Sequence, residues 1–275
     1  MGNSPLKERE GVCKKINMSN INFKIENGVG IITLNRPDKF NSFVRQMAFD
    51  LQKTLDDCEA DKEVRAIYLT AEGKAFCAGQ DLGEAIDPNQ TELPKIVEEH
   101  YNPIIERLRK IEKPIVCGVN GVAAGAGANI ALACDITLAA ESAAFIQAFS
   151  KIGLIPDSGG TYYLPRLVGM QKSAALMFLG DKVMAAEAEQ MGMIYKAVAD
   201  DSLQEEAMAI ASKLAKMPTK GIGLTKRLLN ETFKNTLTEQ LNREGELQNE
   251  AGQTYDYNEG VNAFLEKRKP EFKGE

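Results

Sequence analysis

Apolar and polar residues alternate in two short segments near the start of the chain, Ile21–Glu26 and Val29–Leu34. Alternation with a period of two is typical of a β-strand with one buried face. The two residues between the segments are Asn27 and Gly28, a pair that favours the tight turn of a hairpin. The sequence therefore predicts an antiparallel hairpin over residues 21–34.

The next segment changes to a helical period. Apolar side chains recur about once per turn at Phe43, Met47, Leu51 and Leu55. This spacing predicts an amphipathic helix, with Asn41 or Ser42 as its N-terminal cap. A second helix is expected over residues 95–111, after a polar, proline-containing stretch at residues 84–95 that is typical of a surface loop.

Short apolar segments and helical segments then follow in two groups. Buried strands are expected at residues 65–70, 114–119 and 135–140. Later residues have helical spacing and predict helices over 159–168, 171–179, 185–191, 201–216, 218–233 and 236–266, with residues 193–198 as the one strand among them. Strands that alternate with helices, followed by a helical layer, indicate an α/β fold.

Composition and charge exclude several functions. The chain has 275 residues, a net charge of −6 and no concentrated basic face, which argues against nucleic-acid binding. Its five cysteines include no Cys-x-x-Cys pair, so neither a zinc site nor a redox site is expected. The single histidine, His100, lies in a polar stretch and is expected on a helix surface. No apolar run could span a membrane and the first residues do not resemble a signal peptide, so we expect a cytoplasmic protein.

The most informative stretch is a turn of small residues between an expected strand and an expected helix, residues 120–129. Glycine and alanine let a ligand approach the backbone, and a helix that begins near Ala126 leaves unsatisfied N–H groups and a positive dipole end. These groups could hold an oxyanion. Close packing of helix and strand remains an alternative. A dinucleotide site is disfavoured, because Ile130 stands where that fingerprint needs its third glycine.

Two acidic residues follow turns that resemble functional loops. Asp81 comes after Gly79 and Gln80, and its pattern favours a structural helix cap. Asp157 lies between a proline and Ser158, where it could cap the next helix. If Ser158 caps that helix instead, the carboxylate of Asp157 is free to face a pocket and move a proton.

Four motifs occur in order, at residues 35–41, 76–82, 120–128 and 155–161. They read Asn-Arg-Pro-x-x-x-Asn, Phe-Cys-Ala-Gly-Gln-Asp-Leu, Asn-Gly-Val-Ala-Ala-Gly-Ala-Gly-Ala and Ile-Pro-Asp-Ser-Gly-Gly-Thr. Together they resemble the crotonase (enoyl-CoA hydratase/isomerase) superfamily, over about residues 19–274. The segment 259–270 is similar to the C-terminus of that family.

The resemblance implies a fold of stacked β-β-α units, arranged as a spiral core with a C-terminal helical trimerisation region. Residues 1–17 would be a tail or extension, residues 18–205 the core with its coenzyme A and acyl site, and residues 206–275 the oligomerisation region. The expected assembly is a homotrimer, or a hexamer built as a dimer of trimers. A hydratase paralogue is a further possible partner.

The resemblance also assigns site residues. The backbone N–H groups of Gln80 and Ala126 would form the oxyanion hole. Contacts to coenzyme A would come from Lys39, Phe40, Ala78, Asp81 and Leu82, with Lys267 and Lys269 near the phosphates. No separate cofactor is expected, since coenzyme A is part of the substrate, and no metal is expected.

Two departures from the family pattern bear on the reaction. Asn129 and Phe149 stand where hydratases of this family place two glutamates, and neither residue carries a proton at neutral pH. Asp157 is the acid that remains at a family catalytic position. One carboxylate suffices to move a proton beside a thioester, which favours isomerisation.

The segments 101–103, 125–128 and 148–157 show a finer resemblance, to the phenylacetate-degradation branch of this family. It implies isomerisation of ring-1,2-epoxyphenylacetyl-CoA to the oxepin-CoA, with a side activity that moves a 3-enoyl double bond to position 2. Phe145 and Phe149 would form the apolar wall of the acyl pocket, or would simply pack in the core. The alternatives are a general enoyl-CoA isomerase or hydratase of fatty-acid oxidation and a non-catalytic acyl-CoA-binding subunit.

Overall fold

The structure is a computed structural model that describes residues 15–17, 20–87 and 92–275. Most of the expected N-terminal tail lies outside these residues, although its last three residues form the first strand. Part of the expected surface loop at residues 84–95 lies outside them as well.

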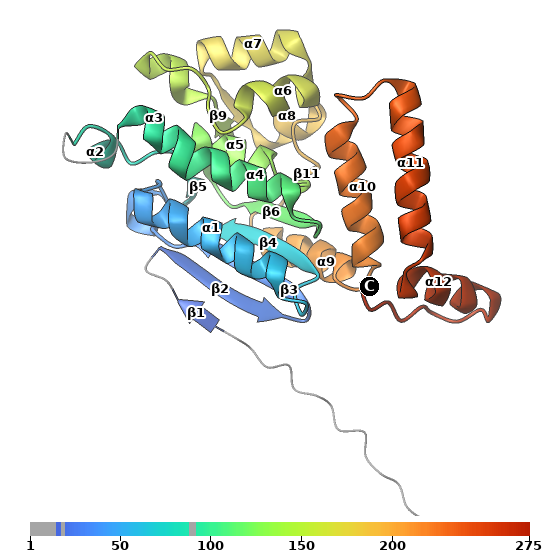
Figure 1. Ribbon diagram of the computed structural model, residues 1–275. Helices are drawn as coiled ribbons and strands as arrows, with labels where there is room; N and C mark the ends of the chain where they lie inside the picture. The colour runs from blue at the N-terminus through green and yellow to red at the C-terminus, as the bar shows by residue number, and fades with distance from the viewer. Residues whose placement is uncertain (1–14, 18–19, 88–91) are drawn as a thin grey trace, which may run out of the picture.

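A seven-stranded sheet forms the centre of the molecule (Figure 1). Its strands, in spatial order, are β1 (Lys15–Asn17), β2 (Ile21–Glu26), β3 (Val29–Leu34), β4 (Ala66–Ala71), β6 (Ile115–Val119), β8 (Ile136–Ala140) and β11 (Lys196–Val198). The predicted hairpin is confirmed, because β2 and β3 pair in antiparallel register from Ile21 opposite Leu34. From β3 onward the neighbouring strands are parallel.

A second sheet of short strands lies at one end of the first. Its order is β10 (Lys182–Met184), β9 (Ala144–Ile146), β7 (Val122–Ala124) and β5 (Ala75–Cys77). Each of β4, β6 and β8 continues into a short strand of this sheet, so the chain repeats a two-strand step before each helical segment. This repetition is the expected stacked β-β-α architecture, and the predicted fold class is confirmed.

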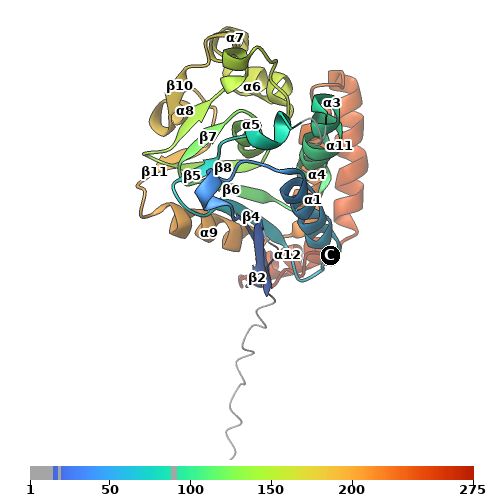
Figure 2. The ribbon, with the colours of Figure 1, turned by 90° about the vertical axis from the view of Figure 1, so that its left-hand side faces the viewer.

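Helices cover both faces of the large sheet (Figure 2). α1 (Arg45–Ala60) and α4 (Asn102–Lys110) lie on one face, and α9 (Leu203–Leu214) packs on the other against β4, β6 and β8. The remaining helical elements before the C-terminal helices are η1 (Pro37–Lys39), α2 (Leu82–Ala85), α3 (Leu93–Lys95), η2 (Ile96–Tyr101), α5 (Ala126–Leu132), η3 (Ala148–Ile152), α6 (Gly160–Val168), α7 (Met170–Leu179) and α8 (Ala185–Gln190).

The C-terminal helices stand beside this core (Figure 1). They are α10 (Thr219–Glu231), α11 (Leu237–Gly252) and α12 (Tyr255–Leu265). The single helix expected over residues 236–266 is therefore wrong, because the chain breaks after Gly252 and the Thr254 side chain caps a new helix. The boundary expected at residue 205 falls within α9, so the helices that project from the core begin with α10.

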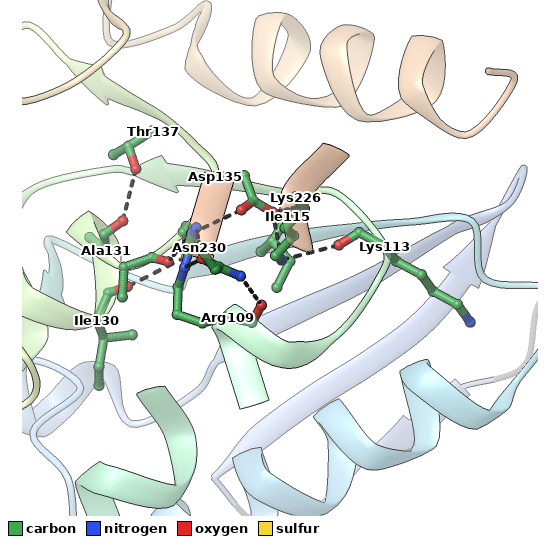
Figure 3. A network of polar contacts seen from close by, with 11 residues as sticks. Arg109, Lys113, Ile115, Ile130, Ala131, Asp135, Thr137, Lys226 and Asn230 are labelled. Carbon is green, nitrogen blue, oxygen red and sulfur yellow. Dashed lines mark hydrogen bonds and ion pairs between the residues drawn. The ribbon is translucent and has the colours of Figure 1, made fainter. Parts of the chain in front are cut away.

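A polar network ties α10 to the core (Figure 3). The carboxylate of Asp135 accepts hydrogen bonds from Lys226 at 2.7 Å, Arg109 at 2.9 Å and the backbone N–H of Ile115 at 2.9 Å. Arg109 also bonds the side-chain oxygen of Asn230 on α10. Burial lowers the pKa of Lys226, and the charge of Asp135 opposes that change. The network fixes α10 against α4 and the ends of β6 and β8.

Three sequence predictions about local structure are wrong. The first helix begins at Arg45, not at a cap formed by Asn41 or Ser42, and the carboxylate of Glu84 accepts the N–H of Arg45 at 2.9 and 3.1 Å instead. The helix expected over 95–111 is divided into α3, the π-helical η2 and α4. The sequence predicted residues 193–198 as the one strand among the later helices, whereas Lys182–Met184 form a further strand, β10, between α7 and α8.

Candidate active site

Two loops meet at the carboxyl side of the short strands β5 and β7. The first contains Gly79, which has a φ of +88°, and the second contains the turn before α5. A methyl group placed on Gly79 would lie 3.1 Å from the carbonyl oxygen of Ala124 and 3.7 Å from the backbone nitrogen of Ala126. Glycine is therefore required for close approach as well as for backbone conformation. The structure thus brings the predicted pair of oxyanion-hole segments into contact.

The backbone N–H of Gln80 is directed by a bridge to Phe43. Phe43 donates its N–H to Gly79 at 2.7 Å and accepts the N–H of Asp81 at 2.8 Å. In such a parallel bridge the N–H of the residue between the two bonded positions points away from the partner strand. The N–H of Gln80 therefore points away from Phe43, and no acceptor among the described residues takes it.

The second N–H group belongs to Ala126, the first residue of α5. Its neighbour Gly125 has a φ of +54° and donates its own N–H to Ile146 at 2.9 Å. The first N–H groups of a helix have no partner within it. No acceptor in the described part of the chain takes the N–H of Ala126, so two N–H donors from adjacent loops are free to bind one oxygen.

Asp157 lies in the loop between η3 and α6. Neither it nor Ser158 caps α6, because the capping residue is Gly159 and no side chain accepts a bond there. Both capping alternatives are therefore wrong. The hydroxyl of Ser158 instead donates to Oδ1 of Asp157 at 2.8 Å. Burial raises the pKa of Asp157, and the hydrogen bond from Ser158 partly opposes that rise. A carboxylate with a raised pKa is a stronger base.

Two side-chain amides form a hydrogen-bonded chain that ends at the backbone of Asp157. Nδ2 of Asn129 donates to the backbone carbonyl of Asp157 at 2.9 Å, and Oδ1 of Asn129 accepts from Nε2 of Gln147 at 2.8 Å. Gln147 is 5% exposed, and its Oε1 has no hydrogen-bond partner within the described residues. Sequence reasoning missed Gln147, since nothing in its local pattern distinguishes it from any other polar residue before a turn.

The two candidate residues for the acyl pocket lie in different surroundings. Phe149 is in η3, and its ring would be 3.6 Å from a methyl group placed on Gly125. Phe149 therefore borders the turn that carries the N–H of Ala126. Phe145 lies in β9 and belongs to the main apolar core.

The candidate residues for coenzyme A come together at the surface. Ala78 donates its N–H to the carbonyl of Phe40 at 3.0 Å, which joins the segments around residues 39–40 and 78–82. Phe40 and Leu82, one on each of these segments, are 57% and 58% exposed. Lys39 is also exposed.

Asp81 has the structural role that its sequence pattern indicated. It caps α2 by accepting the N–H of Gly83 at 3.0 Å, and it forms an ion pair with Arg36 at 3.0 Å. Burial would raise its pKa, but the hydrogen bond and charge of Arg36 outweigh burial and lower it. Lys267 and Lys269 are exposed after α12, at the far end of the C-terminal helices.

Asn41 is a second residue whose importance sequence reasoning misjudged. It is fully buried, and its φ of +53° is one that asparagine tolerates better than most residues. Its Nδ2 donates to the carbonyls of Glu72 and Ala75, both at 2.8 Å, and its Oδ1 accepts the N–H of Arg36 at 2.8 Å. Asn41 thus fixes the loop before α1 to the segment that leads into β5.

His100 is not on a helix surface, contrary to the sequence prediction. It is fully buried between Phe49 and Tyr101, whose rings meet it edge to face. Burial lowers its pKa, and the nearby Arg45 lowers it further. The imidazole is therefore neutral at physiological pH.

A cavity of about 780 Å³ lies between α4, α6 and α10. Its lining includes Gly159 and Tyr163 but not Gln80, Ala126 or Asp157, so it borders the site without containing it. Within the described ranges, no three His, Cys, Asp or Glu side chains are arranged to hold a metal ion. No helix in the described part of the chain is both long and apolar enough to cross a membrane.

Comparisons with known proteins agree with the motifs. The family model for enoyl-CoA hydratase/isomerase matches residues 24–275. A 1,2-epoxyphenylacetyl-CoA isomerase of Escherichia coli is 47% identical, over 91% of this chain and 97% of that protein. A probable enoyl-CoA hydratase of Rhodobacter capsulatus is 43% identical, over 92% of this chain and 98% of that protein. The crystal structure of an enoyl-CoA hydratase from Bacillus anthracis is 32% identical, with a TM-score of 0.87 over 94% of this chain and 100% of that chain.

Proposed function

The chain belongs to the enoyl-CoA hydratase/isomerase family, and on that basis we propose that it is an acyl-CoA isomerase in which Asp157 moves the proton. The observation that carries this proposal is the environment of Asp157. Asp157 is half-buried, and the side chain of Asn129 bonds its backbone carbonyl. Asn129 and Phe149, which borders the turn at Gly125, stand where a water-adding enzyme of this family would have further acids.

The chemistry follows from the two N–H donors and the carboxylate. The thioester oxygen binds between the N–H groups of Gln80 and Ala126. Asp157 takes a proton from carbon 2 of the acyl group, the electrons of that C–H bond form a carbon–carbon double bond, and the carbonyl electrons move to oxygen. The two N–H groups stabilise the resulting negative charge more strongly than the neutral carbonyl, which lowers the barrier.

The protonated Asp157 then returns its proton to a different carbon. The thioester carbonyl forms again and the double bond shifts, so no water, oxidant or metal enters the balance. Substrate and product are isomers. The raised pKa of Asp157 suits both steps, because the group must accept a proton and then release it.

For the substrate we propose ring-1,2-epoxyphenylacetyl-CoA, whose conversion gives the oxepin-CoA. After proton removal at carbon 2, the bond shared by the epoxide and the six-membered ring opens to give a seven-membered ring. The Escherichia coli relative named for this substrate is 47% identical, and the ring of Phe149 offers an apolar surface beside the turn at Gly125. The same groups would move the double bond of a 3-enoyl-CoA to position 2.

Coenzyme A is proposed to bind over Phe40 and Leu82, with Lys39, Ala78 and Asp81 around them. The C-terminal helices are proposed to mediate a homotrimer or a dimer of trimers. Their large apolar side chains support this assembly, because Leu237 on α11 and Phe264 on α12 are 76% and 82% exposed.

A substrate panel tests the proposal. The purified protein is incubated with 1,2-epoxyphenylacetyl-CoA, a 3-enoyl-CoA and a 2-enoyl-CoA, and the products are analysed by mass spectrometry and NMR. We expect products of unchanged mass from the first two, with the epoxide converted fastest. Hydration of the 2-enoyl-CoA as the fastest reaction, seen as the added mass of one water, would overturn the proposal. Binding of all three without conversion would identify a non-catalytic acyl-CoA-binding subunit.

A further inference from the structure

The hydroxyl of Tyr101 contacts the side chain of a proposed oxyanion-hole residue. It donates a hydrogen bond of 2.8 Å to Oε1 of Gln80. Tyr101 is the last residue of the π-helical segment η2, and its side chain is 1% exposed. Single turns of π-helix are rare and occur frequently at functional sites. The bond thus joins the loop of Gln80 to a separate, buried element.

The other end of the Gln80 side chain is held as well. Its Nε2 donates to Oε1 of Glu84 at 3.2 Å. The carboxylate of Glu84 is itself fixed, because both of its oxygens accept the backbone N–H of Arg45 at the start of α1. Both polar ends of the Gln80 amide therefore have partners, and the side chain has a single arrangement.

The ring of Tyr101 and the backbone of Gln80 share a neighbour. Phe43 forms the bridge that directs the Gln80 N–H, and its ring meets the ring of Tyr101 edge to face at 5.8 Å between centroids. Burial raises the pKa of Tyr101 well above its usual value, and the negative charges of Asp157 and Glu84 raise it further. The phenol therefore remains protonated and acts as a donor.

From these contacts we infer that Tyr101 is a positioning residue, which holds the Gln80 side chain so that the Gln80 backbone N–H stays directed at the thioester oxygen. The inference rests on the proposed function. Loss of the hydroxyl frees one end of the Gln80 amide and lets the loop rotate. Small displacements of a group that stabilises a transition state have large effects on rate, about 100-fold for 1 Å.

The test uses phenylacetyl-CoA in D₂O, with exchange at carbon 2 followed by mass spectrometry. This probe lacks the epoxide, so it reports proton removal alone. We expect Tyr101→Phe to lower the maximal exchange rate about tenfold while KM stays within about twofold, because the oxyanion contact strengthens in the transition state. The control is Tyr68→Phe, which removes the hydroxyl of another fully buried tyrosine, in β4 of the large sheet, and should exchange at the wild-type rate.

A second variant separates positioning from a general loss of packing. Gln80→Met removes both side-chain hydrogen bonds and keeps the backbone N–H. We expect it to lower exchange as much as Tyr101→Phe, and the double variant to be no slower than either single one, since both act through one contact. If Tyr101→Phe does not fold, Gln80→Met alone decides: a lower rate at unchanged KM supports the inference, and a wild-type rate overturns it.

The outcomes also separate this inference from the proposed function. Suppose that the wild-type protein exchanges the carbon 2 proton. If Tyr101→Phe exchanges it at the wild-type rate, or loses no more rate than the control Tyr68→Phe, the inference fails and the proposed function stands. Additive losses in the double variant overturn the inference too, because they show independent effects. If the wild-type protein does not exchange the proton at all, the proposed function itself fails.

Discussion

The side-chain amide of Asn129 donates a hydrogen bond of 2.9 Å to the backbone carbonyl of Asp157. This bond joins α5, which carries the N–H of Ala126, to the loop that carries the carboxylate. Gln147 in turn donates to Asn129 at 2.8 Å and restricts its orientation. A position that the family resemblance associates with an acid is thus filled by an amide that holds the two halves of the site together.

Replacement of Asn129 with aspartate tests this link. The new carboxylate keeps the shape of asparagine but turns a donor into a charged acceptor that faces the carbonyl of Asp157. We expect turnover to fall at least tenfold and the free energy of unfolding in urea to fall by about 2 kcal/mol, the cost of an unsatisfied buried group. Asn22→Asp is the control, since Oδ1 of Asn22 accepts from Asn35 at 3.4 Å and an aspartate oxygen can still accept that bond, so stability should change by less than about 0.5 kcal/mol. Equal effects at the two positions would contradict the proposed link.

Alanine substitutions at Gly79 and Gly153 distinguish an effect on the geometry of the oxyanion hole from an effect of backbone strain. Both have positive φ, +88° and +73°, so alanine at either position should cost about 1 kcal/mol of stability. Only the new methyl group at Gly79 contacts the second loop, at 3.1 Å from the carbonyl of Ala124, whereas Gly153 has open space around it.

We therefore expect Gly79→Ala to lower kcat about tenfold and Gly153→Ala to leave it near the wild-type value, with similar unfolding midpoints in urea. Steady-state kinetics of the two variants, measured side by side, check this. The contact between the two loops would lose its proposed importance if Gly79→Ala kept full kcat.

The network at Asp135 should respond unequally to loss of its partners. Asp135→Asn leaves the buried Lys226 and the half-buried Arg109 with a weakened acceptor, and breaking a buried ion pair in this way costs about 3 kcal/mol. Lys226→Met should cost less, because Arg109 and the N–H of Ile115 still bind the carboxylate and the buried cation disappears. Urea unfolding of both variants measures the difference. A larger loss for Lys226→Met would contradict this description of the network.

The pH dependence of kcat/KM should depend on Ser158. Asp157 must be ionised to accept a proton, so activity falls as pH decreases through its raised pKa. The hydrogen bond from Ser158 stabilises the ionised form, so Ser158→Ala should raise that pKa further and move the acid limb of the profile to higher pH. Ser202→Ala is a matched control, since Ser202 makes the same contact with its neighbour Asp201 on an exposed surface. A shift to lower pH, or an equal shift in both variants, would exclude Ser158 as the group that tunes the base.

The sequence predicted the elements of this fold that are long enough to show a regular spacing of apolar residues. The alternation over residues 21–34 predicted the hairpin, and the spacing of Met47, Leu51 and Leu55 predicted α1. Strands β5, β7, β9 and β10 have three residues each, too few for a pattern to develop. Their place in a second sheet depends on pairing between distant segments.

Some residues of the candidate site could likewise be predicted from the sequence, and others could not. The family motifs singled out Gln80 and Ala126, whose loops meet in the structure, and the local pattern around Asp81 predicted its capping role. Local sequence did not reveal that His100 and Tyr101 are buried, because their burial depends on the packing of η2 against α1 in the folded protein. Contacts such as Asn41 with Ala75, 34 residues apart, lie equally beyond any local pattern.

The most direct test of the account is the exchange of the carbon 2 proton of phenylacetyl-CoA by Asp157→Asn. Asparagine keeps the size of the side chain and its contact with Ser158 but cannot take a proton, and loss of a general base typically costs 100-fold or more. We predict that exchange falls by at least about 100-fold while the variant still binds phenylacetyl-CoA and unfolds at the wild-type temperature. Exchange within about threefold of the wild-type rate would show that another group moves the proton, and would contradict the account.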